Sequence, residues 1–86
     1  MPTAEEVQDT VMREISRASG TPKARLKDTH KLRADLVIAH ENFVVLAQNL
    51  RAFIKRSAPD NTLVLRDIDT ASSTVEGVIK MVKERV

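Results

Sequence analysis

Apolar side chains recur with a helical period through the middle of the chain. Residues 36–56 contain neither glycine nor proline, and their large apolar positions are three or four residues apart: Phe43, Leu46, Leu50 and Phe53. This spacing places the four side chains on one face of an α-helix. Val44 and Val45 lie off that face, so the predicted helix is apolar on more than one side. Such a helix either packs centrally among others or presents a second face to a partner.

A second helical pattern covers residues 3–18. Thr3 and Glu6 have the spacing of a capping box, in which each side chain binds the backbone N–H of the other residue. The apolar stripe of this helix recurs at the same period: Ala4, Val7, Val11, Ile15 and Ala18. Gly20 can end the helix in a left-handed conformation, and Pro22 prevents the helix from resuming.

Residues 21–35 show no sustained period, and a connection of this length is unusual in a small helical bundle. Leu26 and Leu32 are its large apolar residues, and we expect them to anchor the connection to the core. A short helical turn near residues 22–27 is compatible with the pattern.

The central helix is predicted over residues 37–57, and the pattern leaves its start open. Asp35 can cap a helix that begins at Leu36, or the helix can begin near His40 and Glu41. Pro59 favours an end just before it.

The chain closes with two further predicted helices, a short one within residues 62–69 and a longer one over residues 73–85. Ser73 and Glu76 have the spacing of a second capping box. The sequence therefore predicts an all-α, small four-helix bundle that forms one domain over residues 1–86. Its expected core consists of Val11, Ile15, Leu32, Leu46, Leu50, Ile68, Val75 and Ile79.

Composition narrows the functional classes. The chain has 86 residues and no cysteine, which excludes disulfides and thiolate zinc sites. The first residues lack the basic and apolar regions of a signal peptide, and no apolar run has the length of a membrane span. We therefore expect a cytoplasmic protein without a membrane span, and a monomer.

Basic residues gather in one segment. Residues 23–33 carry five Lys or Arg against Asp28, whereas the whole chain has a formal net charge of +2. Nucleic-acid-binding domains usually show a broader basic surface. We interpret the segment as a solvated loop with exposed Lys27 and Lys31, and nucleic acid is not the expected partner.

The order of long helix, long loop, helix, short helix and final helix resembles the acyl carrier protein family. Gly20 falls on the glycine that ends the family's first helix, and Asp35-Leu36 falls on its Asp-Leu pair before the second helix. Pro59-Asp60 falls on the family's Ile-Pro-Asp segment, and Thr74-Val75 matches the start of its fourth helix. The resemblance implies a bundle with a long first helix, a long loop, a second helix, a short third helix and a fourth helix.

The resemblance fails at the residue that would carry a cofactor. In the family, a serine in the pattern Leu-Gly-x-Asp-Ser-Leu carries phosphopantetheine at the start of the second helix. Residues 36–41 read Leu-Val-Ile-Ala-His-Glu here, so His40 occupies the attachment position, while Val37 and Ala39 replace the glycine and aspartate. An imidazole cannot form the stable phosphodiester that a hydroxyl forms. We therefore expect no phosphopantetheine and no other cofactor.

Partner recognition also departs from the family. Its second helix is typically acidic, and enzymes of acyl-chain metabolism bind it through basic patches. We expect this chain to dock protein partners, which can include enzymes of acyl-chain metabolism. The expected docking surface lies on its central helix and consists of His40, Glu41, Val44, Val45, Gln48 and Arg51. The competing interpretation is that Val44 and Val45 are buried against the long loop.

The pattern gives no sign of catalysis, and we expect no enzyme activity. His40-Glu41 begins like a zinc-protease motif, but Val44 occupies the position of the second histidine. His30 and His40 alone do not predict a metal site. Two other interpretations remain open: a genuine but divergent acyl carrier in fatty acid or polyketide-type synthesis, and an unrelated small helical adaptor or nucleic-acid-binding module that uses residues 23–33.

Overall fold

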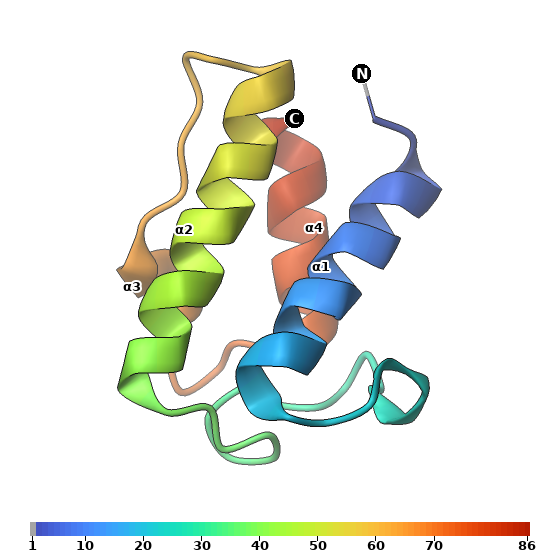
Figure 1. Ribbon diagram of the computed structural model, residues 1–86, viewed down its shortest axis with the longest axis vertical. Helices are drawn as coiled ribbons and strands as arrows, with labels where there is room; N and C mark the ends of the chain where they lie inside the picture. Colours follow the sequence, from blue (N-terminus) through green and yellow to red (C-terminus); the bar gives the residue numbers. More distant parts are fainter. Residues whose placement is uncertain (1) are drawn as a thin grey trace.

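The computed structural model describes residues 2–86 and is all-helical there, with three long helices packed side by side (Figure 1). The elements in chain order are α1 (Ala4–Ser19), the 3-10 turn η1 (Lys23–Arg25), α2 (His40–Ser57), α3 (Leu65–Ile68) and α4 (Val75–Arg85). Helix α1 packs against both α2 and α4, and α3 packs against α2. Figure 1 shows that α1 runs antiparallel to α2 and α4. The predicted small helical bundle is confirmed.

Helix α1 has the Thr3 N-cap and the terminal Gly20 that its sequence predicts, but the Glu6 side chain does not bind the Thr3 N–H to complete the predicted capping box. The Thr3 hydroxyl accepts a hydrogen bond from the Glu6 N–H at 3.1 Å. At the other end Gly20 has a φ of 74° and its N–H donates to the Ser16 carbonyl at 2.9 Å. This positive φ is open to glycine without steric cost. The predicted stripe is wrong at Ala4, which is exposed because the buried face of the helix begins one turn later, at Val7.

Helix α2 begins at His40, so the predicted start at residue 37 is wrong and the later alternative is correct. The Asp35 carboxylate does not cap the helix, because its Oδ2 accepts the Lys31 N–H at 2.8 Å within the loop. The chain then turns at Val37, which has a φ of 50°, and the Ile38 N–H donates to the Leu32 carbonyl at 3.2 Å. These loop contacts fix residues 35–38 in a conformation that cannot continue a helix.

The cap of α4 lies one residue later than predicted. Thr74, not Ser73, is the N-cap, and its hydroxyl accepts the Gly77 N–H at 3.0 Å. Ser73 instead shares a hydrogen bond with the Thr70 hydroxyl at 2.9 Å. Glu76 forms no capping box, because its N–H donates to the Asp28 carbonyl at 3.0 Å. The long loop thus satisfies a backbone donor in the first turn of α4.

The connection between α1 and α2 is part of the folded core. Leu26 is buried and Leu32 is fully buried, as expected for anchors. The Leu32 N–H donates to the Ser73 carbonyl at 3.0 Å, and the Val75 N–H donates to the His30 carbonyl at 3.1 Å. Backbone hydrogen bonds therefore hold the loop against the start of α4.

The predicted core is confirmed throughout. All eight predicted residues are buried: Val11, Ile15, Leu32, Leu46, Leu50, Ile68, Val75 and Ile79. Further buried side chains come from the two connections, namely Leu36, Ile38 and Leu63. No buried side-chain nitrogen or oxygen among residues 2–86 lacks a hydrogen-bond partner. The described core therefore contains no unsatisfied polar side chain that would indicate a buried binding site.

Asp67 joins the short helix α3 to the end of α4. Its Oδ2 accepts the Val64 N–H at 3.0 Å and Arg85 Nη1 at 2.8 Å. Arg85 Nη1 also donates to the Thr62 carbonyl at 3.2 Å. The Val64 N–H first, and then the Arg85 guanidinium, hold the pKa of Asp67 below its ordinary value of 3.8.

Asp67→Asn should lower the free energy of unfolding by about 1 kcal/mol at pH 7, because it removes a charge-assisted hydrogen bond that is partly exposed to solvent. A lowered pKa in the folded state stabilises the fold fully above 3.8, and this contribution disappears as the pH falls through the lowered value. The difference between wild type and variant should therefore shrink in acid, as measured by urea unfolding from pH 7 to pH 2. Asp60→Asn is the matched control, since Asp60 is exposed. An equal difference at every pH would contradict this assignment.

Candidate functional site

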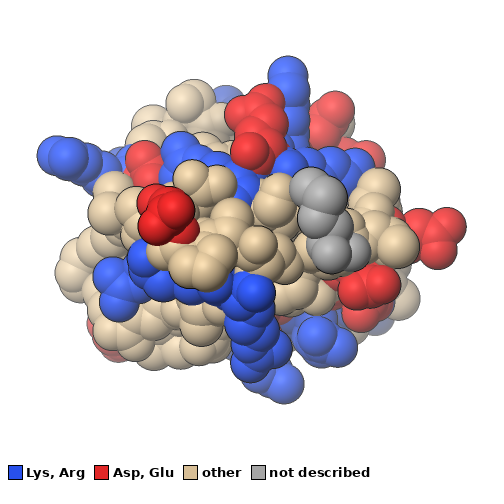
Figure 2. All heavy atoms as spheres, turned by 90° about the horizontal axis from the view of Figure 1, so that it is seen from above, with Lys and Arg blue, Asp and Glu red and all other residues tan. Residues whose placement is uncertain are grey.

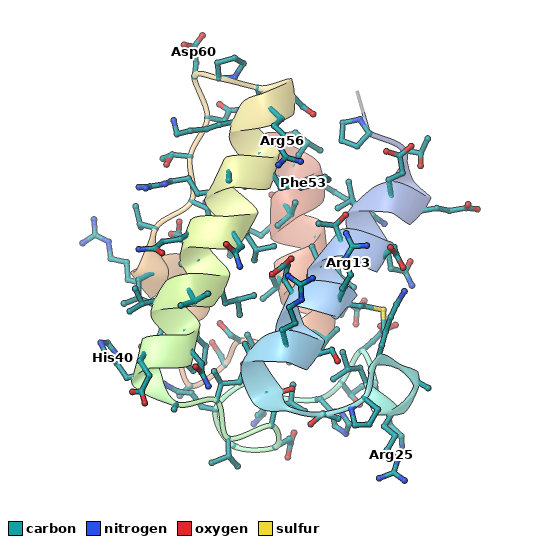
Figure 3. All side chains as sticks on the ribbon, in the orientation of Figure 1. Arg13, Arg25, His40, Phe53, Arg56 and Asp60 are labelled. Atoms are coloured by element: carbon teal, nitrogen blue, oxygen red, sulfur yellow. The ribbon has the colours of Figure 1, made fainter. Side chains whose placement is uncertain are left out.

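His40 is the first residue of α2, and its side chain points away from the bundle (Figure 3). The side chain is 72% exposed, and its Nδ1 lies 3.9 Å from Asp69 Oδ2. Asp69 is more tightly engaged by Arg33, whose Nε donates to its Oδ1 at 2.8 Å. The imidazole is thus accessible to solvent and only loosely held by its nearest carboxylate.

The surroundings of His40 do not form a metal site. Across residues 2–86, no group of three or more His, Cys, Asp or Glu side chains is close enough to hold a metal ion. His30 belongs to the loop, where its Nδ1 accepts the Lys27 N–H at 3.2 Å. The two histidines therefore have separate local environments.

The backbone just before α2 is strained at a specific residue. Val37 adopts a φ of 50° although it is β-branched, and its side chain is 75% exposed. Left-handed geometry costs an ordinary L-residue about 1–2 kcal/mol. Glycine adopts this geometry without such a cost.

Val37→Gly should raise the free energy of unfolding by about 0.5–1 kcal/mol, since it removes the steric cost and loses little burial, against a smaller entropic cost of glycine. Thermal unfolding should show a higher Tm. Val64→Gly is the matched control, because Val64 is also an exposed valine but has a φ of −113° and gains nothing from glycine. A lower Tm for Val37→Gly would show that this turn is not strained.

The six residues expected to dock a partner all lie on α2, but four of them line two different grooves. Val44, Gln48 and Arg51 line a groove of about 210 Å³ against residues 63–65. Val45 lies on the other flank of α2, in a groove of about 100 Å³ that faces α1. Val44 is half-buried and Val45 is 52% exposed, so burial of the pair against the long loop is wrong. The other two, His40 and Glu41, are exposed at the start of the helix.

Sequence reasoning missed two residues of the first groove, Val64 and Leu65. Val64 is 40% exposed, and Leu65 is partly buried against the core. The run Leu63-Val64-Leu65 could have indicated this surface. A segment that packs against the core on one side cannot bury three consecutive apolar side chains, so at least one of them stays exposed. Here Leu63 is buried, whereas Val64 remains at the surface.

None of the charged side chains among residues 2–86 is buried. Lys27 and Lys31 are exposed, as expected for a solvated loop. Figure 2 shows the end of the molecule near the chain termini, where Lys and Arg side chains alternate with Asp and Glu. An interspersed pattern of this kind gives a weaker field for a polyanion than a continuous basic stripe.

The helices of residues 2–86 include none that combines the length and the apolar character needed to cross a membrane. Comparison of the chain with protein-family models, curated proteins and solved structures finds no match.

Proposed function

We propose that this chain is an acyl-carrier-protein-like domain that carries no phosphopantetheine and acts by docking a partner protein through α2. The observation that supports this most directly is the start of α2. The exposed His40 is its first residue. Three positions earlier, Val37 has a positive φ of 50°, a geometry that the glycine of the family motif would favour. The attachment position is accessible, but its side chain has the wrong chemistry.

The rest of the bundle supports the same proposal. A long loop anchored by Leu26 and Leu32 joins α1 to α2, and a short α3 precedes an α4 whose N-cap is Thr74. These are the elements that the family resemblance implies, in the same order. The match concerns the scaffold, whereas the serine and the acidic second helix are replaced.

The docking surface of this proposal consists of the two flanks of α2. One flank presents Val45, and the other presents Val44 beside Val64, with Arg51 along the same groove. A partner suited to this surface offers apolar side chains within an acidic rim. Enzymes of acyl-chain metabolism are the first partners to examine, because they already bind the second helix of carrier proteins.

Intact-mass measurement after incubation with a phosphopantetheinyl transferase and coenzyme A tests whether the chain is a carrier. We expect no mass increase for the wild type, with an authentic acyl carrier protein as the positive control. His40→Ser should also remain a poor substrate, because Val37 and Ala39 still replace the motif's glycine and aspartate.

Efficient modification of the wild type would show a genuine, divergent carrier and overturn the proposal. Efficient modification of His40→Ser alone would show that the transferase-recognition surface survives, so that the lost hydroxyl is the only barrier to carrying an acyl chain.

A further inference from the structure

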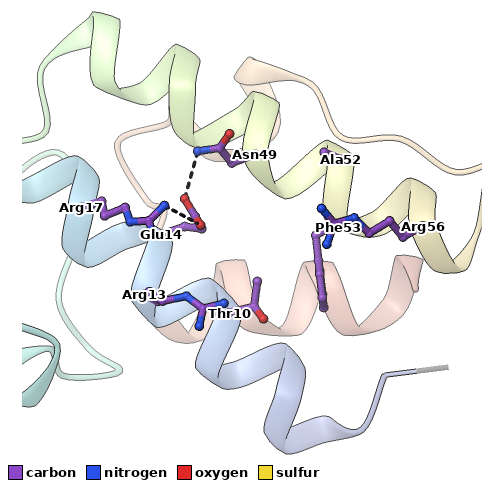
Figure 4. Close-up of a pocket in the computed structure, with 8 residues that line it drawn as sticks. All are labelled: Thr10, Arg13, Glu14, Arg17, Asn49, Ala52, Phe53 and Arg56. Carbon is purple, nitrogen blue, oxygen red and sulfur yellow. Dashed lines mark hydrogen bonds and ion pairs between the residues drawn. The ribbon is translucent and has the colours of Figure 1, made fainter.

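A groove of about 420 Å³ lies between α1 and α2, on the flank of the bundle shown in Figure 4. Three arginines line it: Arg13 and Arg17 from α1, and Arg56 from α2. Phe53 projects from α2 into the space between the helices, and its side chain is partly buried against the core. These residues are separate from His40 and from the groove beside Val44.

Glu14, Arg17 and Asn49 form an internal network that bridges α1 and α2, and they also line the groove beside Val45. Glu14 Oε1 accepts Asn49 Nδ2 at 3.0 Å, and its Oε2 lies 3.5 Å from Arg17 Nη1 (Figure 4). The Glu14 side chain is only 13% exposed. The single carboxylate that lines the groove is therefore already engaged by Asn49 and Arg17.

Two further arginines line the groove, Arg13 from α1 and Arg56 from α2, and neither is held by a close carboxylate. Arg13 Nη1 lies 3.5 Å from Asp9 Oδ2, but Asp9 also binds Lys23, which competes for its charge. Arg56 has no carboxylate within 4.0 Å in the described chain. Three guanidinium groups against one carboxylate give the lining a net charge of +2. An anion that enters the groove is attracted and displaces no strong internal ion pair.

The chemistry of the lining selects among anions. Guanidinium groups bind phosphate through paired N–H donors, and a phosphate monoester carries about −1.5 to −2 charges at pH 7, close to the charge of the lining. The Thr10 hydroxyl, which like Arg13 lines the groove from α1, adds a further hydrogen-bond donor. The Phe53 ring offers an apolar surface for the organic part of the ligand.

A long polyanion fits this groove poorly. Glu5, Glu6 and Asp9 precede Arg13 on α1 and would repel the extension of a nucleic acid strand along that helix. In the other direction, the Glu14–Arg17–Asn49 network bridges the two helices and places the Glu14 carboxylate in the path of such a strand. We therefore propose that the groove between α1 and α2 binds a small organic phosphate monoester, with Arg13 and Arg56 on the phosphate and Phe53 against the organic group.

Titration of the full chain with phenyl phosphate, followed by NMR of the backbone amides and by calorimetry, tests this proposal. We expect saturable shifts around Thr10, Arg13, Phe53 and Arg56. Arg13→Gln and Arg56→Gln should each weaken binding about tenfold, since each removes a charge-assisted contact. Arg66→Gln, at an exposed arginine of α3, is the matched control and should leave binding unchanged.

Two further probes separate the parts of the ligand. Inorganic phosphate should bind the same residues more weakly, and Phe53→Leu should weaken phenyl phosphate while leaving inorganic phosphate unaffected. Circular dichroism checks that each variant is folded. The arginine variants answer the question even if Phe53→Leu unfolds, because both arginine side chains are exposed.

The proposal fails if phenyl phosphate shows no saturable binding, if its shifts localise to residues 23–33, or if neither arginine variant changes its affinity. It also fails if an oligoglutamate peptide saturates this groove while phosphate esters do not, since the site would then be one for an acidic protein segment. None of these results depends on the docking function of α2.

Discussion

Leu50→Ala should lower the free energy of unfolding by about 2–5 kcal/mol, which is the range for emptying a fully buried leucine position. Leu50 lies in the middle of α2 and is 0% exposed. Helix α2 packs against α1, α3 and α4, and Leu50 belongs to the core between them, so we expect its truncation to leave a buried cavity. A loss of this size is a large fraction of the stability of a small domain, which is typically about 5–15 kcal/mol.

Urea unfolding followed by circular dichroism measures this loss, and the denaturant slope should stay unchanged. Gln48→Ala is the matched control, because Gln48 lies in the same helix and is exposed. The control should change the stability by less than about 0.5 kcal/mol. A loss that small for Leu50→Ala would mean that α2 presents a different face to the core.

Val45→Glu should leave the fold intact and weaken binding of a protein partner by tenfold or more. Val45 is 52% exposed, so a carboxylate at this position stays in water and carries no burial penalty. The stability change should remain within about 0.5 kcal/mol, as for other surface substitutions. A charge in the apolar part of an interface is costly, and this cost falls on the complex alone.

Affinity purification of partners from cells that express the protein, followed by calorimetry with the partner identified, measures the effect. Gln8→Glu on α1 is the control, since it introduces the same single negative charge at an exposed position outside α2. Unchanged binding for Val45→Glu would exclude this flank of α2 from the interface. Unfolding of the variant would show that Val45 is needed for packing and would remove the main support for docking there.

The sequence predicted helices and core because both depend on local periodicity. The buried positions of α2 follow the helical period that Leu46 and Leu50 share. Gly20 ends α1 because glycine adopts the left-handed backbone geometry of this position without steric cost. Thr3 likewise caps α1 with a residue three positions away. In each case the partners are neighbours along the chain.

Predictions were wrong where a residue had two possible partners. Asp35 can cap a helix, but its carboxylate binds the Lys31 N–H in the loop, so α2 begins only at His40. Glu76 can complete a capping box with Ser73, but its N–H is taken by the Asp28 carbonyl from a distant part of the chain. The local sequence pattern shows which hydrogen bonds a residue can form, and contacts with the rest of the fold decide which of them it does form.

By itself, the sequence determined that the chain is helical and that eight predicted apolar residues lie in its core. Only the tertiary structure separated Val44 from Val45, because their 100° offset around α2 acquires meaning only once α1 and residues 63–65 occupy its two flanks. The same holds for the groove between α1 and α2. Arg13 and Arg56 are far apart in the chain, and antiparallel packing of the two helices is what brings their charges to one place.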